Sequence, residues 1–562
     1  MYDPESLSKG QKVATMVGAL LGLFLAALDQ TIVSTAGPFI QKDLGIEPGI
    51  YVWITTAYLV ASTVLVPIYG KLSDLYGRRR ILLIAIGIFL GGSLACGLSQ
   101  SAAQLIAFRA VQGAGSAGLF TSAFAIVADL FPPAERGKWQ GIFGSAWGVS
   151  SVLGPLLGGV LTENLSWHWT FFVNVPIGAA AVSLILSKMP PLRRTHDVKP
   201  KLDIAGALAL ALATVPLLLA LSLGHAEGTP AANGWPWQSW QIGALFGTSV
   251  AGIIAFLAIE KRAASPILDF KLFRIKTFAI GSLATFVVGS AFLGAIVFLP
   301  LFMVNVVGLS ATSSGFTTMP LTFGIVFANV TSGQLVSRIG AYKGLLVGSL
   351  VVLVSSFTLF ALTLTTHETQ GAVSLKMFLL GIGLGPSIPL FTLAIQTSVQ
   401  PQQIGVATAA ATFFRQMGTT IGIAILGTIF ATSFASSLRE NMPRADQMPP
   451  QMQAMMQRHG GGEGSARVAF DATKAKAAAD KGIDMSPMPE AGKAAAKERA
   501  HAAIDGVDHA FKQAFTSSLV SVFWVSLAIA LLGLFITVFL PQLPLRRGPQ
   551  GPGQQGPPPA VD

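Results

Sequence analysis

The feature that most constrains this chain is a series of apolar runs, each about as long as a bilayer is thick. A helix needs roughly 20 apolar residues to cross the hydrocarbon core. We find such runs at 13–37, 50–69, 80–99, 103–128, 138–161, 170–188, 203–223, 240–259, 277–304, 313–336, 343–364, 373–396, 403–433 and 516–540. Only 11% of the residues are charged, compared with about 25% in soluble domains. The sequence predicts an all-α polytopic membrane protein with fourteen transmembrane helices.

Basic residues in the short joins predict the orientation of these helices. If the N-terminus lies in the cytoplasm, 22 Lys and Arg fall in inward segments and only Lys42 and Lys376 fall in short outward joins. Loops rich in Lys and Arg stay on the cytoplasmic side. We therefore expect a multi-pass protein of the cytoplasmic (inner) membrane with both termini in the cytoplasm. The same distribution accounts for the net charge of +11 without a nucleic-acid partner.

An internal repeat divides the chain into two related halves. The frame GxLxxxxG occurs at Gly70–Gly77 and again, 263 residues later, at Gly333–Gly340. Repeated halves that flank a midplane site are a transporter architecture. We expect an N-terminal six-helix bundle over 1–190, two linking helices with their flanks over 191–262, and a C-terminal six-helix bundle over 263–545.

Two segments contain no predicted span. The long outward join 434–515 carries eleven Lys or Arg, and long segments translocate largely regardless of charge. Its Ala-rich stretches 464–480 and 492–515 are compatible with helices, but a mobile solvated loop is favoured over a partner-binding cap. The Pro-, Gly- and Gln-rich tail 546–562 is predicted to be disordered.

Four motifs in order relate the chain to a known family. They are Leu28–Pro38, Gly70–Arg80, Arg109–Gly115 and Gly154–Gly159. With them the chain resembles the major facilitator superfamily, and within it the fourteen-helix drug:proton antiporters of the EmrB/QacA type. The resemblance implies two six-helix bundles plus two linking helices, and export of drugs, dyes or antiseptics driven by the proton gradient without a cofactor. Relatives of the EmrB kind in two-membrane bacteria work with a periplasmic adaptor and an outer-membrane channel.

Asp29 and Arg109 are the predicted proton-coupling pair. A carboxylate inside an apolar helix is costly and is usually functional or paired. At 1.5 Å per residue, Asp29 lies about 13 Å and Arg109 about 9 Å from the outer ends of their helices, so the two side chains can meet. Our hypothesis is that Asp29 carries the coupling proton and Arg109 tunes it; a fixed ion pair is the alternative. No second acid lies deep in a span, which speaks against multi-proton coupling and against strong selection for dications.

The join between the second and third helices is a predicted cytoplasmic gate. Asp74 is expected to pair with Arg78 or to cap the following helix, and Asp129 to reach the same arginines. The alternative is that these arginines only hold the loop inside. The predicted gate residues are Gly70, Asp74, Gly77, Arg78, Arg79 and Asp129.

The fifth helix carries the stretch that the family describes as an antiporter signature. The resemblance implies that its small residues make a dry contact between the halves that stops passive leak, since small residues let helices pack closely in lipid. A generic packing helix is the alternative. The predicted residues are Gly141, Ser150, Gly154, Pro155, Gly158 and Gly159, with Ser150 at a position where the family pattern has glycine.

Aromatic and amide side chains predict an apolar substrate cavity with few polar groups, which suits amphipathic ligands. The candidates are Gln30, Trp53, Tyr58, Gln112, Trp147, Phe298, Phe302, Phe413, Arg415 and Gln416. For Arg415, lining the cavity and binding backbone carbonyls are equally supported.

Missing motifs narrow the function further. The chain has no GxxxxGK[ST] loop, which speaks against ATP-driven export. Its histidines lack metal-ligand spacing, so no metal site is predicted, and no catalytic cluster supports a lipid-modifying enzyme. The alternatives that stay open are an exporter of one dedicated substrate, such as a lipid, siderophore or self-made antibiotic, and a passive facilitator.

Overall fold

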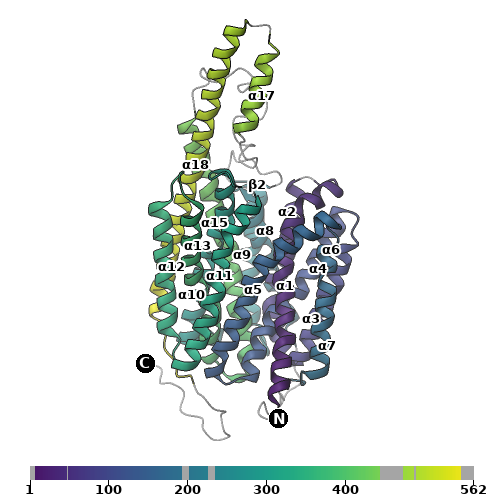
Figure 1. Cartoon of the computed structure of the whole chain (residues 1–562). Coiled ribbons are helices and arrows are strands. Elements are labelled where there is room, and N and C mark those ends of the chain that lie inside the picture. Colours follow the sequence, from purple (N-terminus) through teal and green to yellow (C-terminus); the bar gives the residue numbers. More distant parts are fainter. Residues whose placement is uncertain are drawn as a thin grey trace.

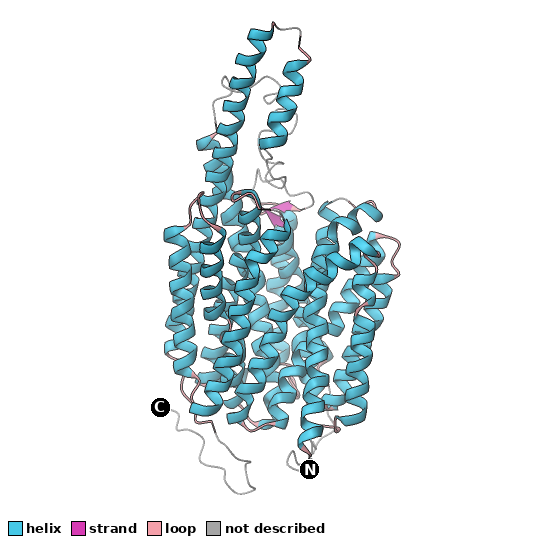
Figure 2. Ribbon diagram, in the orientation of Figure 1, coloured by secondary structure: helices cyan, strands magenta, loops and turns pink. Residues whose placement is uncertain are grey.

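The computed structural model describes residues 7–46, 48–192, 202–225, 234–309, 311–442, 472–486 and 489–545, and these residues are almost entirely helical (Figure 2). The helices are α1 (Lys9–Asp43), α2 (Pro48–Tyr76), α3 (Arg78–Gly97), α4 (Ala102–Leu130), α5 (Pro133–Asn164), α6 (Trp169–Phe172), α7 (Asn174–Lys188), α8 (Ile204–Leu223), α9 (Trp240–Glu260), α10 (Lys276–Asn305), α11 (Ala311–Ile339), α12 (Lys343–Thr363), α13 (Gln370–Leu384), α14 (Ser387–Thr397), α15 (Ile404–Asn441), α17 (Ala472–Asp484) and α18 (Glu490–Val538). Short 3-10 helices, η2 (Phe270–Arg274) and η3 (Pro401–Gln403), and a two-residue parallel pair, β1 (Gly224–His225) with β2 (Trp235–Pro236), complete the described elements.

Thirteen spans in the described part of the chain are long and apolar enough to cross a membrane. Each coincides with a predicted span. The remaining prediction, 277–304, corresponds to α10, whose described apolar part Lys276–Ala291 is shorter than a span. Length and composition therefore support the membrane fold and come within one helix of the predicted count of fourteen.

Two predicted spans are each divided into two helices. The span 170–188 breaks at Val173 between α6 and α7, and the span 373–396 breaks at Gly385–Pro386 between α13 and α14. Proline has no N–H to donate, and its ring clashes with the carbonyl four residues earlier. Pro176 and Pro386 lie at these breaks, so each division has a local cause in the sequence.

The helices form two bundles, with the linking helices α8 and α9 packed on each other and α8 packed against α2 and α15 (Figure 1). One large apolar cluster is built from the C-terminal half, including Phe302, Phe357 and Phe523. A second is built mainly from the N-terminal half, including Phe89 and Phe143. α1 begins and α18 ends at the same end of the molecule, which we call the terminal face.

The repeat is visible in the backbone. Gly77 and Gly340, which end the two copies of the frame, have φ of 93° and 75°. Side chains with a Cβ rarely adopt such angles, so both turns require glycine. The two halves thus repeat the same turn at the terminal face.

In the segment 434–515, the described residues are almost all helical, which agrees with the helical interpretation of its Ala-rich stretches. α15 continues to Asn441, and α18 is a continuous helix of 49 residues that projects beyond the bundle, with α17 packed beside it (Figure 1). Salt bridges join Lys476 to Asp505 at 2.6 Å and Lys497 to Asp484 at 2.8 Å. Alanine has the highest helix propensity, which explains why these Ala-rich stretches fold. The stretch 443–471 and the predicted tail 546–562 lie outside the described residues.

Candidate functional site

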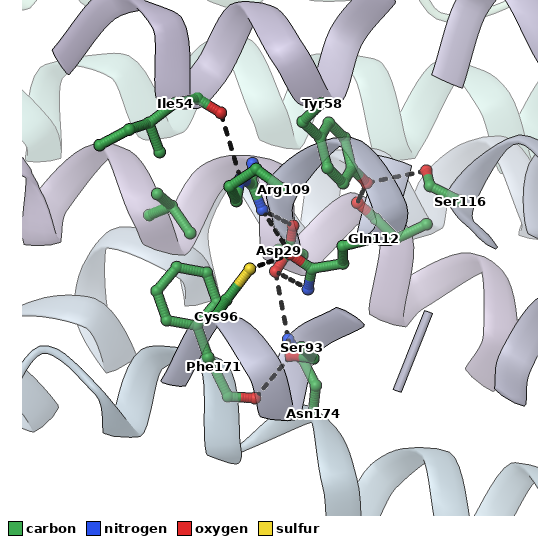
Figure 3. A network of polar contacts seen from close by, with 12 residues as sticks. Asp29, Ile54, Tyr58, Ser93, Cys96, Arg109, Gln112, Ser116, Phe171 and Asn174 are labelled. Atoms are coloured by element: carbon green, nitrogen blue, oxygen red, sulfur yellow. Dashed lines mark hydrogen bonds and ion pairs between the residues drawn. The ribbon is translucent and has the colours of Figure 1, made fainter. Parts of the chain in front are cut away.

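The two predicted coupling residues meet in the centre of the N-terminal half (Figure 3). Arg109 Nη1 lies 2.5 Å from Asp29 Oδ2, and both side chains are fully or almost fully buried. Asp29 is on α1 and Arg109 on α4. The depth estimate that placed them at similar levels is therefore confirmed.

Two amides complete the surroundings of the Asp29 carboxylate. Gln112 Nε2 donates to Asp29 Oδ1 at 2.7 Å, and Asn174 Nδ2 donates to the same oxygen at 3.2 Å. Arg109 also donates to Gln112 Oε1 at 2.8 Å and to the Ile54 carbonyl at 3.3 Å. A buried charge is tolerated when it is paired and hydrogen-bonded. Three side-chain donors from α4 and α7 thus surround the two oxygens of the Asp29 carboxyl group.

An outer shell of polar and aromatic groups orients the pair. The Arg109 guanidinium carbon lies 4.2 Å from the centre of the Tyr58 ring, and the Tyr58 hydroxyl donates to Ser116 Oγ at 2.7 Å. Asn174 also donates to Ser93 Oγ at 3.0 Å. The sequence analysis did not single out Asn174, Ser93 or Ser116. An amide inside the apolar run 170–188 was the signal that could have identified Asn174.

At the terminal face, Arg78 is the centre of the predicted gate. Its Nη2 lies 2.5 Å from Asp74 Oδ1 and its Nε 2.6 Å from Asp129 Oδ2. Both predicted contacts of Arg78 are therefore present. Arg79 points elsewhere and donates to the Leu186 carbonyl at 2.7 Å.

Asp74 caps a helix of the other half and not the following helix α3. It accepts from the backbone N–H groups of Gly405 at 3.2 Å and Val406 at 2.9 Å, in the first turn of α15. The first N–H groups of a helix have no partner within it, and the helix dipole favours an anion there. One carboxylate thus joins α2 to α15 across the two halves.

Glycines bring the halves into contact on this side. A Cβ on Gly70 would lie 2.3 Å from the Cβ of Ala409, so α2 and α15 approach closely only because Gly70 has no side chain. The halves also meet where α5 packs on α11, and there a Cβ on Gly141 would lie 2.3 Å from the Asn329 carbonyl oxygen of α11. Gly137, Gly144 and Gly148 also face α11. The halves are therefore closed together at and near the terminal face.

The other small residues of the predicted antiporter stretch lie elsewhere. Gly154 packs on Thr31 and Gly158 on Ile32 of α1, within the same half. Thr31 also donates to the Ser150 carbonyl at 2.8 Å. Pro155 is exposed, and a Cβ on Gly159 would have no neighbour within 4 Å. The dry contact between halves is thus made by the first part of α5, with Gly141 the only predicted residue in it.

Comparison with known proteins identifies the family. The model of the Major Facilitator Superfamily matches residues 19–423. The chain belongs to this superfamily. The transporter is 36% identical over 444 residues to "Multidrug transporter protein MdtP" of Bacillus subtilis (strain 168), covering 79% of this chain and 80% of the relative. It is 37% identical over 438 residues to "Multidrug resistance protein 3" of the same organism, covering 78% and 83%.

Solved structures share the fold. The human organic anion transporter MFSD10 matches with a TM-score of 0.56 at 17% identity, over 75% of this chain and 94% of that one. A bacterial homologue of the lysosomal transporter Spinster matches with a TM-score of 0.51 at 16% identity, over 95% and 98%. These relatives and neighbours are transporters, so the protein is a membrane transporter and not an enzyme.

The ten predicted cavity residues do not lie at one place in the transporter. Tyr58 and Gln112 belong to the Asp29 network, and Gln30 lies next to Tyr58. Phe298 stacks on Phe430 at 4.6 Å inside the C-terminal bundle, where Phe302 is also buried.

The remaining candidates lie nearer the contact between the halves. Trp53 packs against the linking helices, while Phe413 and Trp147 pack against the cluster of the N-terminal half. The side-chain oxygen of Gln416 is buried without a hydrogen bond in the described part of the chain. Arg415 lines a small hollow between α10, α14 and α15.

Proposed function

We propose that this transporter is a proton-coupled antiporter that exports small amphipathic compounds across the cytoplasmic membrane by alternating access. The observation that carries the proposal is the buried Asp29 carboxylate, held by Arg109, Gln112 and Asn174. Drug-export relatives with over 35% identity support the direction and the cargo.

The proposed coupling of proton binding to transport rests on the ion pair of Asp29 with Arg109. Asp29 is charged while Arg109 holds it, and protonation removes the attraction that ties α1 to α4. Water has no access in this conformation, since Asp29 has no exposed surface. A proton therefore reaches Asp29 only when the halves move. Proton binding and the conformational change are linked in this scheme, as antiport requires.

The distribution of Lys and Arg favours a cytoplasmic position for the terminal face. With that orientation, the contacts of α2 with α15 and of α5 with α11 close the cytoplasmic side. The described conformation is then closed to the cytoplasm, and a further movement of the halves is needed before Asp29 takes up a proton.

The projecting hairpin of α17 and α18 then lies on the outer side, where a periplasmic adaptor and outer-membrane channel would bind. Deleting 443–510, which removes the hairpin and rejoins α15 to α18 near the contact of Phe434 with Phe511, tests this part of the proposal. Recruitment predicts that efflux falls in cells while transport by the purified protein is unchanged. Equal rates in cells would contradict it.

The experiment for the antiport mechanism uses proteoliposomes loaded with a pH-sensitive dye. Addition of ethidium, rhodamine 123 or a quaternary ammonium antiseptic should release protons with the wild type. The Asp29→Asn variant should release none while still binding the same compounds. No substrate-linked pH change with any of the three would contradict proton antiport.

A further inference from the structure

Arg415 is a deep cation without an ionic partner. It is half-buried in α15, next to Phe414 and Met417, which belong to two apolar clusters, and among the described residues its guanidinium makes no hydrogen bond or salt bridge. The N-terminal half shows the contrast, because Arg109 there is paired with Asp29. Ionisable residues inside a membrane almost always pair or mark a pathway. The missing partner of Arg415 therefore needs an explanation.

Among the described residues, no carboxylate contacts Arg415. Between Asp269 and Glu440 the sequence contains one acid, Glu368, and this residue forms a salt bridge with Lys376. Asp29 already accepts from three donors in the other half. An anion for Arg415 must come from outside the chain.

The surroundings of Arg415 suit the acidic group of a ligand. The hollow beside it is lined by hydroxyls of Thr285, Ser387 and Thr419 and by the apolar side chains of Val288, Ile388 and Phe391. The three hydroxyls now donate to carbonyls of Gly281, Leu384 and Gly289. A hydroxyl rotates, so each is able to donate to a ligand instead. Charge-assisted hydrogen bonds of this kind are the strong ones.

The hollow lies where the halves meet. Ile388, one of its lining residues, also packs against the apolar cluster of the N-terminal half. In this conformation the space measures about 20 Å³, which is room for about one water molecule. A larger ligand enters only when the halves change their contact, as alternating access provides.

We propose that Arg415 recognises the acidic group of an anionic or zwitterionic amphipathic cargo, with the hydroxyls of α10, α14 and α15 around it. The inference rests on the proposed export function, because it specifies the cargo of the same transporter. It differs from selection for cations, for which a carboxylate in the cavity would be expected.

Acid and ester pairs of dyes test the proposal. Rhodamine 123 is the methyl ester of rhodamine 110, and fluorescein has a matching methyl ester, so each pair differs in one carboxylate. Binding to the purified full chain is followed by fluorescence polarisation without any ion gradient. We expect the wild type to bind each acid about tenfold more tightly than its ester, the effect of about one charge-assisted hydrogen bond.

Variants assign the preference to Arg415. Arg415→Gln should weaken binding of the acids about tenfold and leave the esters within about twofold, while Arg415→Lys should retain most of the acid binding. Arg439→Gln removes the same charge from the exposed end of α15 and should change neither. Because Arg415→Gln removes an unpaired charge, its melting temperature should equal or exceed that of the wild type, which separates lost recognition from lost folding.

Some results would overturn the inference. One is that the wild type binds the acids no more tightly than their esters, or binds neither dye pair. Another is that Arg415→Gln weakens binding of acid and ester equally. Failure of proton-coupled export gives a different result: the acid preference persists in the binding assay, while substrate-linked proton release is absent in proteoliposomes.

Discussion

The two copies of the repeated turn share a backbone conformation, but each makes a contact of different strength with a helix of the other half. We call these two contacts latches. In the N-terminal copy, Asp74 accepts from the N–H groups of Gly405 and Val406 at the start of α15, and Arg78 holds it in place. In the C-terminal copy, Ser337 lies at the equivalent position, 263 residues later. Its hydroxyl accepts one N–H, from Lys138 near the start of α5, at 3.3 Å.

The difference shows how a repeated fold can hold an asymmetric gate. An anion at a helix N-terminus contributes about 0.3–1 kcal/mol when exposed and up to about 2 kcal/mol when partly buried. A neutral hydrogen bond contributes about 0.5–1.5 kcal/mol. Both contacts include a close approach at glycines, but the contact of α2 with α15 adds a charged group, Asp74, whereas the contact of α5 with α11 adds only the neutral Ser337 hydroxyl.

The same asymmetry continues deeper in the molecule. The N-terminal half holds a complete ion pair, Asp29 with Arg109, while the C-terminal half holds Arg415 without a carboxylate among the described residues. In our two proposals, the N-terminal half binds the proton and the C-terminal half binds the acidic group of the cargo. Four sets of variants test these differences between the halves.

The largest effect is expected at the deep pair. Asp29→Asn leaves Arg109 buried without its partner, which costs about 3–5 kcal/mol of stability. The double variant Asp29→Asn with Arg109→Gln should recover much of the melting temperature of the purified protein. Proton-coupled transport should stay lost in both. A double variant that transports at the wild-type rate would reduce the pair to a structural tie between α1 and α4.

The second largest effect is expected at the glycine-lined contact of α5 with α11, which we call the glycine seam. Gly141→Val places a side chain against the Asn329 carbonyl, and overpacking of this kind costs about 1–3 kcal/mol. The closed state at the terminal face should become about 5- to 150-fold less populated, and transport should fall accordingly in a proteoliposome assay. Gly159→Val on the same helix serves as the control, because a Cβ at Gly159 would have no neighbour within 4 Å. Equal effects of the two variants would mean that the seam does not act as a gate.

The charged latch should have an intermediate effect. Asp74→Asn keeps an acceptor oxygen but removes the charge, which should weaken the closed state by about 1–2 kcal/mol, or about 5- to 30-fold. Maleimide labelling of Ala409→Cys, in a background with Cys96→Ala, reports the opening, since Ala409 is fully buried against Gly70 in the closed state. Labelling that does not increase would show that Asp74 is not needed for closure.

The neutral latch should have the smallest effect. Ser337→Ala removes one long hydrogen bond and should change transport by no more than about twofold, or 0.4 kcal/mol. Ser337→Asp supplies a charge at the start of α5 and should stabilise the closed state by about 0.3–1 kcal/mol, so that transport becomes slower. If Ser337→Ala were as damaging as Asp74→Asn, the two latches would be equivalent after all.

Much of the site could be predicted because it depends on the depth of residues within their helices and on the spacing of residues along the chain. Helical rise alone brought Asp29 and Arg109 to the same level, and the spacing of Arg78 four residues after Asp74 on adjoining helices made their pairing an expectation. These contacts lie within one half, close to recognisable motifs.

Contacts between distant segments could not be predicted in this way. Asp74 and Val406 are 332 residues apart, and nothing near either one specifies the other. Asn174 was missed because a single amide in an apolar run gives no partner. For the hairpin of α17 and α18, the sequence allowed helices in its Ala-rich stretches, but their packing against each other could not be predicted because the partners, such as Lys476 and Asp505, are far apart in the chain.

The unbroken length of α18 has a mechanical consequence. At 1.5 Å per residue, its 49 residues form a rod of about 74 Å, of which roughly half stands clear of the bundle. No flexible joint separates the rod from the C-terminal half, into whose apolar cluster its lower part packs. A 10° rotation of that half would swing the free end through about 6 Å, so the hairpin is a lever. A partner bound to the free end would be displaced in each transport cycle, and its binding would in turn oppose the rotation.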